Sequence, residues 1–423
     1  MRRSRAGIVT AGCAALVSAL SLAGCGSGPA ARPAAGASPT ASSSAAAAAG
    51  AARPDRALEA VRPAWPFRHP LPGMPPVVGG DVYSQTRRGM LSPTVAGERS
   101  LLYVPDSKGS SVTVIDPRTR RIVKVIPTGY LSQHVVPAYD LSRLLVNASV
   151  ADELVPLDPR TVTRGRSITV PRPYNLYFTP DGKQAVVMVE QHDTLRFSDP
   201  HTFAVRDEVH PAGCRGPNHA DFSANGRFFV VTCEFSGQLV KVDTLTHRVL
   251  GEISFDLHRT ASGGDPTTMG MSMPQDVRLS PDGRTFFVAD MGTNELRRVS
   301  ARTFRQVGVI GMPSHPHGIY PSRDGRLLYV SDRGAGQVSV VNPRTDRIVE
   351  TWTIPGGGSP DMGGVSADGR TLWLAGRYDG EVYGFDTRTG HLTARIHVGG
   401  SPHGLAVWPQ PGRYSLGHTG NMR

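Results

Sequence analysis

The sequence has few lysines, few cysteines and few charged residues for its length of 423 residues. Only 19% of the residues are charged, and there are four lysines, at Lys108, Lys124, Lys183 and Lys241. Neither the lysines nor the arginines form a long basic run. The formal net charge of +11, which includes Arg2, Arg3 and Arg5, therefore does not indicate a nucleic-acid partner.

The sequence also lacks the usual catalytic signatures. It has no Gly-x-Ser-x-Gly turn, no phosphate-binding loop and no Cys-x-x-Cys-His haem attachment, so motifs assign no enzyme activity and no cofactor. No charged stretch of coiled-coil type is present, whereas the chain has 48 glycines and 35 prolines. Turns and strands are therefore expected to dominate.

The N-terminus has the features of an export signal. A basic start precedes an apolar run at 6–20, and Leu22-Ala23-Gly24-Cys25 follows where a signal peptide would be cut. These four residues resemble a bacterial lipobox, which implies a signal peptide over 1–24 and diacylglycerol on Cys25. Residues 25–61 are mostly Ala, Ser, Gly and Pro and are predicted to be a disordered tether. We expect a monomer anchored by lipid on the extracytoplasmic face of the cell membrane; an uncleaved anchor is the alternative.

Two turn patterns recur along the rest of the chain, at intervals of about 42 residues. One is an Asp-Gly or Asn-Gly hairpin signal, as at Asp282-Gly283, and the other is a polar turn such as Asp116-Pro117-Arg118-Thr119, with seven copies. This period is the length of one four-stranded propeller blade. The sequence therefore predicts an all-β, seven-bladed β-propeller of four-stranded antiparallel blades over 99–423, after a lead-in over 62–98.

The strand count predicts how the propeller closes. The last inner strand, His403 to Val407, has no blade of its own, and the first blade lacks an inner strand, so we expect these two to pair. The segments 77–99 and 414–423 are then expected to cover the seam between the first and last blades.

Within each repeat, one short motif resembles a known family. Tyr329-Val330-Ser331-Asp332, Phe287-Val288-Ala289-Asp290 and Tyr103-Val104-Pro105-Asp106 are similar to the YVTN-type, YncE-like repeat of bacterial seven-bladed propellers. The resemblance implies the fold and leaves function open, because such propellers include surface proteins, binding proteins and relatives of the haem d1 propeller.

One position in each repeat, at the start of the innermost strand, is always polar. We expect these residues to form a ring at the mouth of a water-filled channel, where a ligand could bind. The ring consists of His134, Tyr174, Asn218, Gln275, His317, Asp361 and His403.

Two further features could bind a metal ion. His134, His317 and His403 fall in neighbouring blades, and the one long insertion, at about 256–273, carries Met269, Met271 and Met273. Imidazoles and thioethers could hold copper or another transition metal, with the insertion as a lid. A purely structural role for all these residues is the alternative.

The two cysteines outside the leader, Cys214 and Cys233, bracket one predicted hairpin. In an oxidising compartment we expect them to form a disulfide, with free thiols as the alternative. The leading functional hypothesis is a scaffold that binds a small molecule or a protein. A lactonase-like hydrolase that uses a histidine with Asp361, and a copper or redox protein, are the alternatives.

Overall fold

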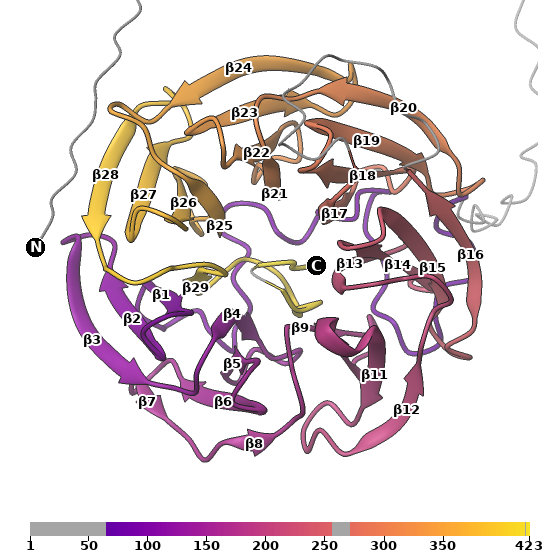
Figure 1. Cartoon of the computed structure of the whole chain (residues 1–423), viewed down its shortest axis with the longest axis horizontal. Helices are drawn as coiled ribbons and strands as arrows, with labels where there is room; N and C mark the ends of the chain where they lie inside the picture. Colours follow the sequence, from indigo (N-terminus) through magenta and orange to yellow (C-terminus); the bar gives the residue numbers. More distant parts are fainter. Residues whose placement is uncertain (1–64, 256–270, 419) are drawn as a thin grey trace, which may run out of the picture. The chain divides into compact units, whose positions relative to one another are not determined.

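The computed structural model describes residues 65–255, 271–418 and 420–423 of the chain. Almost all regular structure in these residues is β-strand, arranged as seven antiparallel sheets around a central axis (Figure 1). The predicted seven-bladed β-propeller of four-stranded blades is therefore confirmed. The leader, Cys25, the tether and Met269 lie outside the described residues.

The blades follow one another along the chain. Blade 1 consists of β29 (Ala406–Trp408), β1 (Leu101–Asp106), β2 (Ser111–Asp116) and β3 (Arg121–Pro127). Blade 2 consists of β4 (Ser132–Pro137), β5 (Leu144–Ala148), β6 (Glu153–Asp158) and an interrupted outer strand, β7 (Thr163–Arg164) and β8 (Ile168–Thr169). Blade 3 consists of β9 (Asn175–Phe178), β10 (Ala185–Val189), β11 (Thr194–Ser198) and β12 (Val205–Val209). Blade 4 consists of β13 (Pro217–Phe222), β14 (Phe228–Cys233), β15 (Gln238–Asp243) and β16 (Val249–Ser254).

The remaining three blades have the same order. Blade 5 consists of β17 (Pro274–Leu279), β18 (Thr285–Asp290), β19 (Glu295–Ser300) and β20 (Gln306–Gly311). Blade 6 consists of β21 (Pro316–Pro321), β22 (Leu328–Asp332), β23 (Gln337–Asn342) and β24 (Arg347–Thr353). Blade 7 consists of β25 (Pro360–Val365), β26 (Thr371–Gly376), β27 (Glu381–Asp386) and β28 (Leu392–His397).

Helix is nearly absent from the described part of the chain. It is limited there to one 3-10 turn, η1 (Glu190–His192). None of the described helical structure is long and apolar enough to span a membrane.

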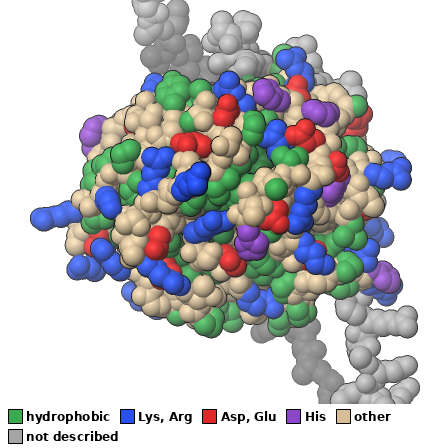
Figure 2. Space-filling view, turned by 90° about the horizontal axis from the view of Figure 1, so that it is seen from below, with side chains coloured by type: hydrophobic (Ala, Val, Ile, Leu, Met, Phe, Trp, Pro, Cys, Tyr) green, Lys and Arg blue, Asp and Glu red, His purple; other side chains and the backbone are tan. Residues whose placement is uncertain are grey.

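The core lies between neighbouring blades. Innermost strands such as β13 and β25 are buried along their whole length, whereas an outermost strand such as β3 is exposed at nearly every residue. One apolar cluster, for example, joins Tyr103 and Val114 of blade 1 to Val146 and Val155 of blade 2. On the side shown in Figure 2, basic and acidic side chains are interspersed.

The recurring turns have the predicted structural role. At the Asp-Gly hairpin between β17 and β18, Gly283 has a φ of +69°, a value that favours glycine. In the polar turn after β27, one oxygen of Asp386 accepts hydrogen bonds from the backbone N–H groups of Arg388 and Thr389, both at 2.9 Å.

The antiparallel order defines two faces of the propeller. Innermost strands begin at one face, which we call the upper face, and end at the opposite, lower face, where blades 3 to 7 have their Asp-Gly or Asn-Gly hairpins. The lead-in lies along the lower face, where the N–H of Leu71 donates to the carbonyl of Asn225 and the hydroxyl of Tyr83 donates to the carbonyl of Leu279.

The C-terminal strand completes the first blade. β29 pairs antiparallel with β1, with Val407 opposite Leu102, so the inner edge of β1 is covered. The strand begins at Ala406, and His403 precedes it. Part of the lead-in reaches this seam, because Leu91 bridges to Gly412 and Glu98 accepts a hydrogen bond from the indole N–H of Trp408.

The segment after β29 takes a course that we did not predict. The C-terminal tail, which we define as residues 414–418 and 420–423, enters the channel instead of covering the seam (Figure 1). His418, Asn421 and Arg423 are all buried there. The physical reason is that their polar side chains find buried partners on the inner strands.

We predict that closure of the first blade by β29 contributes more to thermal stability than the tether does. Removal of residues 404–423 exposes the edge of β1 and removes the C-terminal tail from the channel, so the thermal midpoint should fall by more than about 10 °C. Removal of residues 26–54 is the control and should change the midpoint by less than about 2 °C. Calorimetry of both deletions tests this expectation, and equal midpoints would contradict it.

Candidate functional site

The structure brings the seven predicted ring residues together at one level of the channel. The hydroxyl of Tyr174 lies 3.5 Å from Nε2 of His403, and the amide of Asn218 lies 3.5 Å from Oε1 of Gln275. However, all seven side chains are buried, with Tyr174 the most exposed at 8%. The seven side chains therefore pack against one another inside the propeller rather than standing exposed at an open mouth.

Asp361 is the centre of this upper tier. Its Oδ2 lies 2.6 Å from Nδ1 of His403, and its Oδ1 lies 3.2 Å from Nη1 of Arg333. Nδ1 of His317 is 3.0 Å from the same Oδ1 but is not aligned for a hydrogen bond. Burial alone would raise the pKa of Asp361, but His317 and Arg333 outweigh it and hold that pKa below its ordinary value.

A bulge in the innermost strands turns two consecutive residues toward the axis. In blade 4 the register shifts between Pro217 and Ala220, and in blade 5 it shifts between Pro274 and Val277. His219 and Asp276 therefore line the channel directly below Asn218 and Gln275. Strict strand alternation would place only one residue of each pair inside the channel.

These additional residues form a middle tier with the C-terminal tail. Nδ2 of Asn175 lies 3.2 Å from Nδ1 of His219 and 3.2 Å from Nδ1 of His418. Nε2 of His418 is 3.7 Å from Oδ1 of Asp276. The predicted ring does not include His219, Asp276 or His418. For His219 and Asp276, two adjacent polar residues after the first proline of the strand were the available signal.

The lower tier consists of paired charges. Arg423 of the tail donates to Oδ1 of Asp221 at 2.8 Å, and Arg278 donates to Oδ2 of Asp276 at 3.2 Å. The backbone N–H of Leu279 donates to the other oxygen of Asp221 at 2.7 Å. All four charged side chains are almost fully buried. The tail therefore supplies a counter-charge that blade 4 lacks by itself.

Five buried histidines are in close contact along the axis: His134, His219, His317, His403 and His418. Burial lowers the pKa of His219 to about 3 and holds the pKa of each of the others well below its ordinary value. All five are therefore neutral at pH 7. Neutral His403 donates its Nδ1 proton to Asp361, which leaves Nε2 as an acceptor for the Tyr174 hydroxyl.

The predicted cysteine and methionine features are only partly within this region. Cys214 and Cys233 form a disulfide, with their Cα atoms 5.2 Å apart. Met271 is 64% exposed at the surface, and Met273 is half-buried with its N–H bonded to Asp290. Met269 lies outside the described residues, and so does most of the insertion expected to act as a lid.

The last residue of the repeat motif has different surroundings in different blades. Asp290 of blade 5 lies 2.6 Å from Nε of Arg297. Asp332 of blade 6 has no such cation: Ser339 donates to its Oδ2 at 2.6 Å, and its buried Oδ1 has no partner among the described residues. Burial raises the pKa of Asp332 to about 7.

Comparison with known families agrees with this architecture. A family model described as YNCE-like beta-propeller matches residues 137–234 and 261–411, more than half of the chain. No curated protein matches the sequence.

Several solved structures share the fold. A hydrazine synthase structure from Kuenenia stuttgartiensis has a TM-score of 0.57 and 18% identity, and the match covers 70% of this chain and 94% of that one. A functionally unknown protein from Desulfotomaculum acetoxidans DSM 771 has a TM-score of 0.59 and 16% identity, with 73% and 98% covered. The dihydro-heme d1 dehydrogenase NirN in complex with DHE has a TM-score of 0.53 and 13% identity, with 80% and 78% covered. At these identities the similarity shows the fold alone.

We predict that Arg423→Ala destabilises the propeller, because it leaves Asp221 buried without its cation. The expected loss in the free energy of unfolding is about 3 kcal/mol. The exposed Arg388→Ala is the control and should cost less than about 0.5 kcal/mol. Urea unfolding at pH 7 measures both, and a small effect of Arg423→Ala would show that the tail pairing is dispensable.

The two motif aspartates should respond oppositely to amidation. Because the folded-state pKa of Asp332 lies above its unfolded value, this carboxyl weakens the native state as the pH rises from about 4 to about 7. Asp332→Asn should therefore stabilise the protein by about 2 kcal/mol at pH 7.5 and have little effect at pH 4.5.

Asp290→Asn is the matched variant for this test. It breaks a buried ion pair with Arg297 and should destabilise the protein at pH 7.5. Urea unfolding of both variants at the two pH values distinguishes them. Equal effects of the two substitutions on stability at pH 7.5 would refute the conclusion that Asp290 is paired with a cation and Asp332 is not.

Proposed function

The chain belongs to the YNCE-like β-propeller family, and from this premise we propose that it is a lipid-anchored extracytoplasmic scaffold whose upper face binds another protein. The family match and the fold support the scaffold. The anchor and the partner are the parts of the proposal that need experiment.

The anchor and the compartment are supported by two features. The lipobox-like sequence Leu22 to Cys25 follows a basic and then apolar segment of the kind found in export signals. Separately, the disulfide between Cys214 and Cys233 suits an oxidising environment outside the cytoplasm.

The observation that carries the interaction proposal is a set of large apolar side chains exposed on the upper face. Tyr130 is 53% exposed, Phe235 52%, Met271 64% and Tyr378 71%. Each lies in a connection at the upper end of a blade: before β4, between β14 and β15, before β17, and between β26 and β27. Aromatic residues and methionine are enriched in protein interfaces and costly to leave in water.

A charged group, the guanidinium of Arg333, lies beside one of these apolar side chains. The guanidinium of Arg333 lies 5.4 Å from the ring of Tyr378 and also pairs with Asp361 of the upper tier. A partner at Tyr378 would therefore contact a surface held in place by the buried network below it. A small molecule would instead have to displace side chains that already fill the channel.

A lactonase-like hydrolase is the second candidate, and one arrangement favours it. His403 lies between Asp361 and Tyr174, which resembles a base oriented by a carboxylate. Burial raises the pKa of Tyr174 well above its ordinary value, so this hydroxyl is a poor nucleophile. The scaffold is therefore the better supported of the two.

Site-specific photocrosslinking in cells that express the protein tests the proposal. A benzoylphenylalanine at Tyr378 or Phe235 should give a discrete crosslinked product in the membrane fraction. Val205 and Leu250 lie on outer strands with similar exposure, 54% and 52%, and serve as controls that should give none. Cys25→Ser should release the folded protein from the membrane.

The outcomes separate the two parts of the proposal. Membrane retention unchanged in Cys25→Ser would contradict the lipid anchor. Absence of a product at Tyr378 and Phe235, or an equal product at Val205, would contradict the interaction surface. Turnover in a lactone screen that is lost in His403→Gln would support the hydrolase instead.

A further inference from the structure

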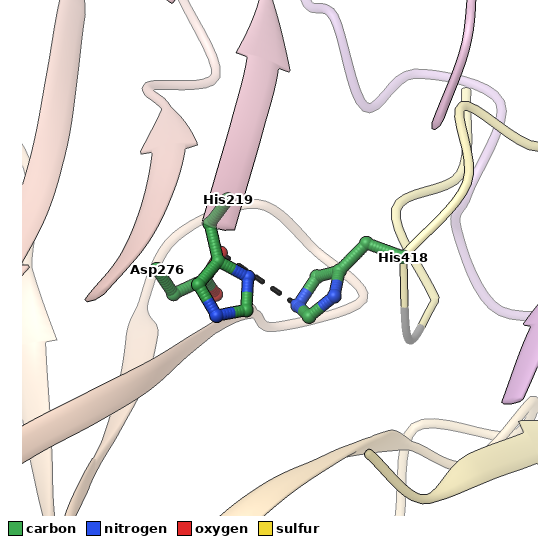
Figure 3. A group of neighbouring side chains, drawn as sticks. All are labelled: His219, Asp276 and His418. Carbon is green, nitrogen blue, oxygen red and sulfur yellow. Dashed lines mark ion pairs between the residues drawn. The ribbon is translucent and has the colours of Figure 1, made fainter. Parts of the chain in front are cut away.

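Three buried side chains from distant parts of the sequence converge in the middle tier (Figure 3). His219 comes from β13, Asp276 from β17 and His418 from the C-terminal tail, and one donor atom of each lies within 4.8 Å of the others. All three side chains are fully buried. Imidazole nitrogen with carboxylate oxygen is a donor set for zinc and neighbouring metals. We infer that this cluster binds one divalent transition-metal ion, and Zn²⁺ is the probe that represents it.

A second observation points to the same place. Nε2 of His219 and both ring nitrogens of His134 are buried and have no hydrogen-bond partner among the described residues. The ring of His134 lies 5.7 Å from that of His219 and 5.4 Å from that of His418. Buried polar atoms are nearly always paired, so these nitrogens require an explanation. An ion bound at the cluster would give Nε2 of His219 a partner. The neighbouring His134 is the side chain that we propose as a fourth ligand.

Asn175 is the hydrogen-bond donor beside the two imidazoles of the metal-free cluster. Its Oδ1 accepts the backbone N–H of Leu176 at 2.9 Å, so its Nδ2 faces Nδ1 of His219 and of His418. The same Nδ2 lies 3.3 Å from the Tyr177 hydroxyl and 3.3 Å from the Asn218 carbonyl oxygen. Because an amide nitrogen donates and does not accept, we infer that each neutral imidazole keeps Nδ1 unprotonated toward Asn175 and carries its proton on Nε2. When an ion binds an Nε2, the proton of that imidazole moves to Nδ1 and the ring stays neutral. Asn175 then presents a donor where an acceptor is needed.

Because of this mismatch, the residue at position 175 should affect the affinity of the cluster for the ion. An aspartate there keeps one oxygen for the N–H of Leu176 and offers the other to the Nδ1 protons of the ligated imidazoles. Second-shell carboxylates of this kind strengthen metal binding by histidine. Asn175→Asp should therefore tighten binding about tenfold, an effect in the opposite direction from loss of a ligand.

The surrounding charges limit the affinity. Oδ2 of Asp276 accepts from Arg278 and from the backbone N–H of Ile319. Oδ1 lies on the side of His418 and accepts the backbone N–H of Val277 at 2.9 Å, so an ion would use its second lone pair. Arg278 and Arg423 balance Asp276 and Asp221, so the ion brings charge that is not fully neutralised. We expect weaker binding than at a zinc site made of thiolates. Binding would connect the C-terminal tail to blades 4 and 5.

The test uses the purified full-length protein freed of metal. Zn²⁺ titrated by calorimetry should bind at one equivalent, and Co²⁺ should give the visible absorption of an ion with nitrogen and oxygen ligands. His418→Ala and Asp276→Asn should each weaken binding at least tenfold. The exposed His391→Ala removes a histidine outside the channel and should leave binding unchanged. Zn²⁺ should raise the thermal midpoint of the wild type but not that of His418→Ala.

Several results would overturn the inference. These are no binding to the wild type, or binding that is unchanged in both His418→Ala and Asp276→Asn. If His317→Ala abolished binding and His418→Ala retained it, the ion would bind in the upper tier, and the proposed middle-tier site would also be refuted. If the ligand variants do not fold, Asn175→Asp decides: an affinity and Co²⁺ spectrum equal to those of the wild type would refute the site.

Discussion

An open sheet edge is the constraint on which the rest of the structure depends. Seven blades leave no free inner edge only if the first blade takes a strand from the far end of the chain, and β29 fills that position beside β1. This pairing also decides where the following residues go. Having reached the innermost position of blade 1, the chain continues into the axis, and the tail lies among the inner strands.

The contents of the channel follow from the need to pair buried polar groups. The buried Asp221 and Asp276 are paired with Arg423 and Arg278, and Asp361 is paired with Arg333 and His403. The histidines meet the same constraint by remaining neutral. The axis is thus a layered set of hydrogen bonds and ion pairs in which the C-terminal tail takes part as fully as the blades. This explains why the exposed upper face is a more accessible place for a partner than the channel.

The sequence was informative wherever a repeat marks a position. The Asp-Gly hairpins and polar turns indicated the blades, and counting from them placed His317, Asp361 and His403 in one tier. The bulges could not be predicted in this way, because a strand with an extra residue has the same turn signals as one without it. His219 and Asp276 were therefore absent from the predicted ring. The course of the C-terminal tail was not predictable either, because it lies outside the repeats and its placement depends on long-range contacts such as the one between Arg423 and the buried Asp221.

The pairing of β29 with β1 has a consequence for the order of events during synthesis. About three hundred residues separate Leu101 from its neighbour Trp408, so the ribosome releases β1 long before its partner exists. During that interval an apolar strand with unpaired backbone groups is available to any other nascent strand, including the equivalent strand of a second copy. Export in an unfolded state followed by folding outside the cytoplasm would shorten this interval, because both strands would then be present together. The closure that stabilises the finished propeller therefore makes its assembly sensitive to how the chain is delivered.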